Sequence, residues 1–295
     1  MQLQGLYVAL VTPFTADGAI DEDGFRSNIE FLIDSGVAGI VPCGTTGESA
    51  TLSWDEHNKV VEIAVQAANG RVSVIAGAGS NNTSESIEAA RHAKQCGAQA
   101  ILCITPYYNK PTQEGLYQHY RQIASTVDID MVVYNVPGRT GVNLLPQTVE
   151  RLCELDHVIG VKEASGDIEQ VSEIHRRCGE RLTILSGDDA LTLPILAVGG
   201  KGVISVVGNF VPDRMIAMIR AFFDGNQAEA LRQHEELLPI CASMFIETNP
   251  IPVKTAMNHL GFAGGPLRLP LVPMAEDNKK RLISVLKTGN VASRK

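Results

Sequence analysis

The alternation of short apolar runs with amphipathic stretches constrains the fold of this 295-residue chain more than any other feature. An apolar run of strand length followed by a helical pattern occurs eight times. The strands are expected at residues 7–13, 38–43, 72–76, 100–105, 130–135, 158–162, 182–186 and 202–207. The helices that follow them are expected at residues 21–35, 53–68, 84–96, 113–126, 146–155, 168–178, 190–198 and 212–223.

Eight such units predict an α/β fold, a (β/α)8 TIM barrel, in preference to an open doubly wound sheet. The expected strands are apolar on both faces, which is typical of buried, parallel strands. The remaining residues, 227–295, exceed what a barrel needs and show three further helical patterns, at 227–245, 250–260 and 275–286. We therefore predict a catalytic barrel domain of residues 1–226 and a C-terminal helical appendage of residues 227–295 that packs on the barrel or on a partner.

Composition excludes several classes of protein. Hydrophobic residues make up 44% of the chain and charged residues 20%, as in soluble globular proteins. The net charge of −8 argues against a nucleic-acid partner. No apolar run approaches the roughly 20 residues of a membrane helix, and the N-terminus lacks the basic segment of a signal peptide. Six cysteines without a CxxC pair favour reduced thiols and a cytoplasmic location. No spacing typical of a metal site is present, so we expect no metal or cofactor.

A lysine ends the sixth expected strand. The run 158–161 is apolar, and Lys162 follows it directly. A lysine at the end of a buried strand is unfavourable unless its charge is paired or its pKa falls. With a lowered pKa it becomes a nucleophile that forms a Schiff base with a carbonyl substrate. The alternative is that Lys162 pairs with a nearby carboxylate such as Glu163, and spacing alone does not choose between the two.

Other reactive side chains end neighbouring strands, where TIM barrels place their active sites. Gly44-Thr45-Thr46-Gly47 offers amides and hydroxyls for a small carboxylate, or is simply a tight turn. Tyr134 ends the strand before Lys162 and either transfers protons or lies on the rim. Arg139 follows in a Pro-Gly turn, where it either binds a carboxylate or forms a surface ion pair. Their convergence beside Lys162 favours a site.

Three motifs resemble those of a known family. Gly44-Thr-Thr-Gly-Glu48, Tyr134-Asn-Val-Pro-Gly-Arg-Thr-Gly141 and Gly160-Val-Lys-Glu-Ala164 are similar to signatures of the pyruvate-dependent class I aldolases. The similarity extends to Asn249-Pro-Ile-Pro-Val-Lys254. Gly-Thr-Thr and Arg139 favour the branch that condenses pyruvate with L-aspartate 4-semialdehyde into a cyclic precursor of diaminopimelate and lysine. The alternative is a related aldolase that cleaves sialic acid or keto-deoxy sugar acids.

The resemblance implies a role for each site residue. It makes Lys162 the Schiff-base residue and Tyr134 the start of a proton relay through Thr45 to Tyr108, which enters from a neighbouring subunit. It places the pyruvate carboxylate near Thr45 and Thr46, and the semialdehyde carboxylate on Arg139. It also assigns substrate binding to Gly187 and Ile204. The implied assembly is a homo-oligomer, a tetramer built as a dimer of dimers.

The resemblance further implies an effector site. In feedback-inhibited members, L-lysine binds at a subunit interface. The matching positions here are Ser49, Ala50, His57, Asn81, Glu85 and Tyr107. Glu85 has an alternative explanation as an acidic first-turn residue favoured by the helix dipole. Trp54 stands where some sensitive members carry a histidine, so we expect partial inhibition with altered or weak potency.

Two functions of other classes compete. A phosphosugar isomerase on this fold would need a phosphate site after the seventh and eighth strands, where residues 207–212 offer only one glycine. A catalytically inactive barrel could sense pyruvate or an amino acid, but the complete set of reactive residues argues against it.

Overall fold

Eight parallel strands close into a barrel in the order β1 to β8, in a computed structural model that describes residues 1 and 3–294. The predicted (β/α)8 fold is thus confirmed. The strands are β1 (Gly5–Ala9), β2 (Gly39–Val41), β3 (Ser73–Gly77), β4 (Ala100–Ile104), β5 (Asp130–Asn135), β6 (Val158–Glu163), β7 (Thr183–Ser186) and β8 (Gly202–Ser205).

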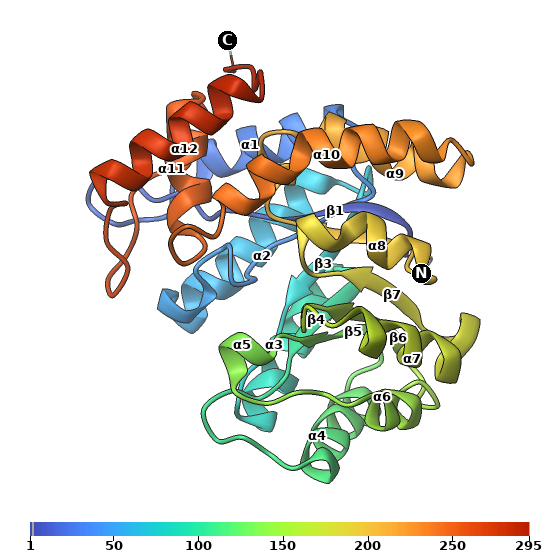
Figure 1. The fold of residues 1–295 in the computed structure, drawn as a ribbon. Coiled ribbons are helices and arrows are strands. Elements are labelled where there is room, and N and C mark those ends of the chain that lie inside the picture. Colours follow the sequence, from blue (N-terminus) through green and yellow to red (C-terminus); the bar gives the residue numbers. More distant parts are fainter. Residues whose placement is uncertain (2, 295) are drawn as a thin grey trace.

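Helices surround the barrel and extend beyond it (Figure 1). Those between the strands are α1 (Glu22–Asp34), α2 (Trp54–Ala68), α3 (Thr83–Cys96), α4 (Gln113–Thr126), α5 (Pro137–Thr140), α6 (Pro146–Leu152), α7 (Ile168–Cys178) and α8 (Thr192–Ala197). After β8 follow α9 (Pro212–Phe223), α10 (Gln227–Ser243), α11 (Ile251–His259) and α12 (Glu276–Thr288).

The strands separate two apolar layers. Along β1, Tyr7 and Ala9 belong to the cluster inside the barrel, whereas Leu6 and Val8 belong to the cluster under the helices. This alternation follows from the two-residue period of a strand. It explains why both faces of each strand are apolar, and it places any polar side chain on the inner face among buried neighbours.

Several strand ends differ from the sequence-based expectation. The first strand ends at Ala9 and not at residue 13, and β8 ends at Ser205 and not at residue 207. β2 is only three residues long because Cys43 turns into the left-handed region, with φ of 56°. Sequence analysis also missed α5, a four-residue helix that begins at Pro137. The three shorter strands lengthen loops at the end of the barrel that holds the reactive residues, whereas α5 adds a helical turn to the loop after β5.

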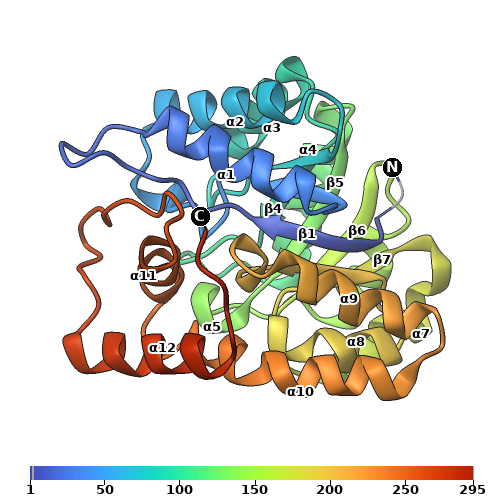
Figure 2. The same ribbon diagram turned by 90° about the horizontal axis from the view of Figure 1, so that it is seen from above.

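The C-terminal helices pack on the barrel's own helices. α10 contacts α9, and α12 contacts both α10 and α11. Figure 2 shows α10 alongside α9 and α8, with α11 nearer to α1. The division at residue 226 stays a prediction, and Gln2 and Lys295 of the two predicted ranges lie outside the described residues.

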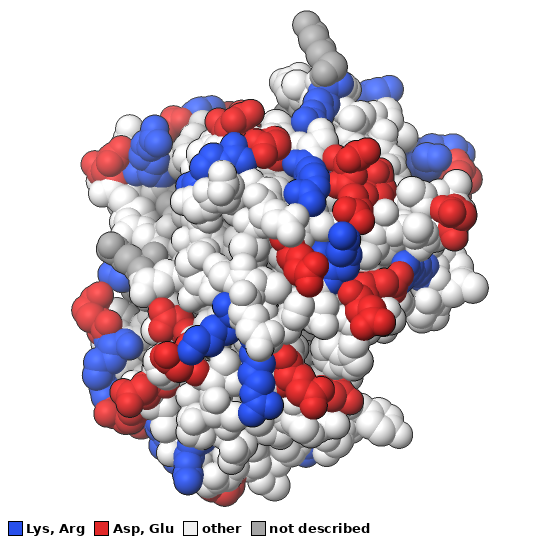
Figure 3. All heavy atoms as spheres, turned by 180° about the vertical axis from the view of Figure 1, so that it is seen from behind, with Lys and Arg blue, Asp and Glu red and all other residues white. Residues whose placement is uncertain are grey.

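Charged side chains of both signs cover the outside. On the described surface of the face in Figure 3, basic and acidic residues are interspersed and no broad area carries a single sign. Among the described residues, no helix combines the length and the apolar character that crossing a membrane requires.

Candidate active site

Lys162 and Tyr134 lie side by side inside the mouth of the barrel. They are register partners between β6 and β5, so their side chains point to the same side of the sheet. The Lys162 ammonium nitrogen is 4.2 Å from the centre of the Tyr134 ring. Both are nearly buried, at 6% and 7% exposure. Sequence analysis predicted this proximity.

The surroundings make Lys162 a better nucleophile than an exposed lysine. Burial lowers the pKa of Lys162 to about 8, the positive charge of Arg139 acts in the same direction, and the carboxylate of Asp189 opposes both. The alternative partner Glu163 points away, as the next residue of a strand must. Its carboxylate accepts hydrogen bonds from Asn135, Ser165 and Gln170. Among the described residues, Lys162 forms no ion pair with Glu163.

Tyr134 keeps its proton. Burial raises the pKa of Tyr134, while Arg139 and a hydrogen bond with Thr45 lower it in part. The phenol is therefore neutral near pH 7 and can donate a proton to a neighbouring oxygen. Its contact with Thr45 brings the ends of β5 and β2 together.

The 44–48 turn is both a tight turn and an available cradle. Gly47 and Glu48 donate their amides to the carbonyls of Gly44 and Thr45, at 3.1 Å each. The amides of Thr45 and Thr46 donate no hydrogen bond to another described residue. A small carboxylate can accept from these two amides. A tight turn and a binding site for a small carboxylate are thus compatible in residues 44–48.

Thr45 and Thr46 differ in what their hydroxyls contact. Thr45 lines a cavity of about 490 Å³. The Thr46 side chain is 2% exposed, and its hydroxyl accepts a hydrogen bond of 3.0 Å from the Asn249 amide. The Thr46 hydroxyl is thus already engaged by Asn249, whereas its backbone amide has no protein acceptor among the described residues, and its role in substrate binding stays a prediction.

Arg139 is held at the edge of the same cavity by α5. Its guanidinium donates to the Asn249 carbonyl oxygen at 3.2 Å. Arg139 is exposed, but among the described residues it forms no ion pair, so the surface ion pair expected as the alternative is not present. The remaining guanidinium N–H groups are free for a bidentate contact with a carboxylate.

Gly187 and Ile204 shape the surroundings of Lys162. A Cβ atom on Gly187 would lie 2.7 Å from Ala164 Cβ and 3.1 Å from Lys162 Cε, so only glycine fits there without displacing the lysine. Ile204 is 1% exposed and belongs to the same inner cluster as Tyr134. Gly187 therefore leaves room for the lysine, and Ile204 contributes to the apolar interior of the barrel.

Tyr108 stands apart from this group. Its side chain is 89% exposed and does not line the cavity, and its backbone adopts φ of 71°. β4 ends at Ile104, so the adjacent residues Tyr107 and Tyr108 lie in the loop after the strand. Within a single chain, therefore, the side chain of Tyr108 does not contact Tyr134.

Most of the predicted effector residues line the cavity that reaches Thr45 and Arg139. They are Ser49, Ala50, His57, Glu85 and Tyr107, whereas Asn81 lies outside the lining and donates to the Tyr107 carbonyl at 3.1 Å. Lys162 and Tyr134 also lie outside the lining.

Two of these residues, His57 and Glu85, already contact neighbouring side chains. Trp54 lines the cavity and packs edge-on against His57, with 5.3 Å between ring centres. Glu85 accepts hydrogen bonds from Ser80 at 2.7 Å and from Asn82 at 3.3 Å. It lies in the first turn of α3, so it also has a structural role at the start of this helix. A ligand would compete with those contacts.

Two residues of the C-terminal region that help to build the site were not predicted from the sequence as site residues. Asn249 bridges Thr46 and Arg139, and Lys254 on α11 pairs with Glu48. The motif that contains Asn249 and Lys254 was noted, but its contacts with Arg139, Thr46 and Glu48 join residues that are 110 to 206 positions apart in the sequence. The alternation of strand and helix patterns along the sequence does not indicate these contacts.

Comparisons with known proteins agree with this geometry. The family model described as the dihydrodipicolinate synthetase family matches residues 2–289. A relative from Pelobacter propionicus, named 4-hydroxy-tetrahydrodipicolinate synthase, is 53% identical and covers 97% of this chain and 98% of its own. A dihydrodipicolinate synthase structure from Aquifex aeolicus superposes with a TM-score of 0.97 at 45% identity, covering 99% of this chain and 100% of its own. An enzyme from Cyanidioschyzon merolae, described with lysine bound, gives 0.95 at 40% identity, with 98% of each chain covered. The chain with the buried lysine of β6 therefore belongs to the dihydrodipicolinate synthetase family.

Proposed function

We propose that this chain condenses pyruvate with L-aspartate 4-semialdehyde to give 4-hydroxy-tetrahydrodipicolinate, through a Schiff base on Lys162. The observation that carries the proposal is the buried Lys162, with its pKa lowered to about 8, against the face of Tyr134. Two relatives that are 53% and 54% identical to this chain are named 4-hydroxy-tetrahydrodipicolinate synthase. Their name favours this reaction over the cleavage of sugar-derived keto acids.

The first step forms the imine. The neutral Lys162 amine attacks the carbonyl carbon of pyruvate, and water leaves with the former carbonyl oxygen. Tyr134 is protonated and lies beside the amine, so it donates the proton that the leaving oxygen needs. The amides of Thr45 and Thr46 donate hydrogen bonds to the pyruvate carboxylate and fix its orientation.

The second step forms the carbon–carbon bond. The protonated imine withdraws electrons, so the pyruvate methyl group loses a proton and becomes an enamine. The enamine carbon attacks the aldehyde carbon of the second substrate, whose carboxylate binds Arg139. The amino group of that substrate then attacks the imine carbon, which closes the ring and releases Lys162. No cofactor takes part in this sequence.

The assembly and the effector belong to the same proposal. The exposure of Tyr108 supports a homo-oligomer, a tetramer, in which this tyrosine completes the proton relay of a neighbouring subunit. L-lysine is the proposed effector, bound near Glu85 and His57 in the shared cavity. The six free cysteines support a cytoplasmic location.

Trapping the imine tests the proposal. Incubation with pyruvate and borohydride should add one reduced pyruvyl group to the peptide that contains Lys162, as measured by mass spectrometry. Lys162→Met should abolish labelling, whereas Lys201→Ala, a surface lysine paired with Glu180, should label like the parent protein. Persistent labelling of Lys162→Met would contradict the assignment. A coupled assay with L-aspartate 4-semialdehyde and with sugar-derived aldehydes then identifies the second substrate.

A further inference from the structure

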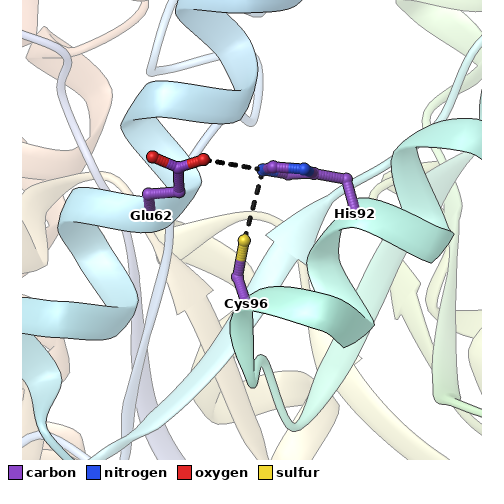
Figure 4. Close-up of side chains that lie close together, drawn as sticks. All are labelled: Glu62, His92 and Cys96. Atoms are coloured by element: carbon purple, nitrogen blue, oxygen red, sulfur yellow. Dashed lines mark hydrogen bonds and ion pairs between the residues drawn. The ribbon is translucent and has the colours of Figure 1, made fainter.

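Three side chains of metal-binding type converge on the outside of the barrel, where the helices α2 and α3 meet. His92 and Cys96 lie four residues apart on α3, so they share one face of that helix. Glu62 on α2 faces them across the contact between the two helices. Figure 4 shows the carboxylate, the imidazole ring and the thiol pointing toward a common point.

The distances fit a shared cation. His92 Nε2 is 3.5 Å from Glu62 Oε1 and 3.2 Å from Cys96 Sγ. Zn²⁺ bound tetrahedrally by nitrogen, oxygen and sulfur would hold its N and O ligands roughly 3.3 Å apart and its N and S ligands roughly 3.5 Å apart. The observed separations therefore need only shifts of a few tenths of an ångström.

Hydrogen bonding alone leaves this arrangement poorly satisfied. The same Nε2 atom is also 3.4 Å from the carbonyl oxygen of Asn58, so three polar atoms surround one ring nitrogen. One ring nitrogen thus has three polar neighbours, and its distances to the two oxygens, of Glu62 and Asn58, exceed the usual 2.9 Å of an N–H···O bond. A cation in place of the proton interacts with the imidazole, the carboxylate and the sulfur at once.

We propose that Glu62, His92 and Cys96 form a zinc site that joins α2 to α3. A neutral imidazole, a carboxylate and a thiolate together balance the charge of a divalent cation. Mixed nitrogen, sulfur and oxygen ligands suit zinc better than magnesium or calcium, which prefer oxygen alone. The side chains of His92 and Glu62 are 24% and 41% exposed, so the fourth position is open to water. This site is independent of the proposed aldol reaction.

The test uses the full-length, reduced and chelator-treated protein with zinc chloride as the probe. Calorimetry should show one equivalent bound per chain, and Co²⁺ should give the near-ultraviolet absorption of a cobalt–thiolate bond. Zinc at about 100 times its Kd should raise Tm by roughly 5 °C, because it binds the folded chain alone.

Variants separate this site from incidental binding. Cys96→Ser should abolish the cobalt–thiolate absorption, and Cys96→Ser and Glu62→Gln should each weaken zinc binding by at least about tenfold. Glu62 is a surface residue, so Glu62→Gln keeps the test valid if Cys96→Ser does not fold. The control is His157→Asn, since His157 is also half-buried and faces Asp128 and Asp130 but no cysteine. Absence of stoichiometric zinc binding overturns the proposal, and so does equal binding by all four proteins.

Discussion

Lys254 on α11 and Glu48 at the end of the 44–48 turn form an ion pair of 2.6 Å, and both side chains are only 1% exposed. The Lys254 ammonium group also donates to the carbonyl oxygens of Thr12, at 3.0 Å, and Pro266, at 2.6 Å. Glu48 adopts φ of 52°, a strained conformation for a residue with a side chain. The pair therefore fixes the turn that carries Thr45 to the C-terminal region.

The first prediction removes one partner of this pair. Lys254→Met leaves the carboxylate of Glu48 buried without a counter-charge, which should lower the free energy of unfolding by about 3–5 kcal/mol. Chemical denaturation measures the change, and Lys280→Met in an exposed pair with Asp277 serves as the control that should change little. Adding Glu48→Gln to Lys254→Met should recover part of the loss, and full stability in Lys254→Met alone would show that the pair is not needed.

The second prediction concerns pH. Imine formation needs the neutral amine, and burial holds the pKa of Lys162 at about 8. The rate of pyruvate adduct formation should therefore rise with pH up to about 8 and level off above it. At pH 7 about a tenth of the enzyme would be reactive, compared with less than about 0.1% for a lysine of ordinary pKa. Single-turnover trapping across pH 6–10 measures the profile. A rise that continues to pH 10 would mean that the surroundings do not lower the pKa.

The third prediction concerns the space beside the lysine. In Gly187→Ala the new methyl group would lie 3.1 Å from Lys162 Cε and 2.7 Å from Ala164 Cβ. We expect kcat to fall by about 100-fold because the amine is displaced from the pyruvate carbonyl. Gly138→Ala is the matched control, since its Cβ meets no atom within 4 Å. Circular dichroism checks that both variants fold, and equal activity of the two would refute the steric argument.

The fourth prediction tests the shared site. Tyr108→Phe should lower turnover while leaving imine formation with pyruvate intact, because the lysine and Tyr134 remain in place. Mixed oligomers of Tyr108→Phe and Arg139→Ala subunits should regain part of the activity, since each supplies what the other lacks. Tyr117→Phe, another tyrosine on the outside of the barrel, should behave like the parent protein. Failure of verified mixed oligomers to recover would place Tyr108 outside a neighbour's site.

The fifth prediction tests the effector. L-lysine should inhibit partially, and Glu85→Ala should weaken its binding by about tenfold or more through loss of a charged hydrogen bond. Glu88→Ala, an exposed acidic residue of the same helix, is the control. Trp54→His should strengthen inhibition, because histidine frees space beside His57 and can accept a hydrogen bond. Calorimetry with L-lysine measures each affinity. If millimolar L-lysine gives neither a heat of binding nor inhibition, the cavity is not an effector site for L-lysine.

Periodicity predicted the parts of the molecule that depend on local sequence. The eight strands, and the neighbouring positions of Tyr134 and Lys162, follow from apolar runs and from the rule that parallel strands end on one face. The four-residue helix α5 was missed because so short a segment shows no helical period, and only Pro137 at its start marks it.

Other features depend on contacts that no local pattern encodes. The Thr46 hydroxyl accepts a hydrogen bond from Asn249, which lies 203 residues away in the sequence, and no local pattern indicates that contact. The left-handed conformation of Cys43 lies where the second strand was expected to end, and the apolar run gives no sign of it. The contact between Thr46 and Asn249 forms only when the C-terminal region packs on the barrel.

Asn249 also has a consequence for the order in which the protein matures. The ribosome synthesises β8 before it synthesises Asn249 and Lys254, which follow β8 by more than 40 residues. The last strand of the barrel and the residues that complete the substrate-binding mouth are thus made at different times. A nascent chain that has all eight strands still lacks the groups that hold Thr46, Arg139 and Glu48 in position. It acquires a finished catalytic mouth only when synthesis is nearly over.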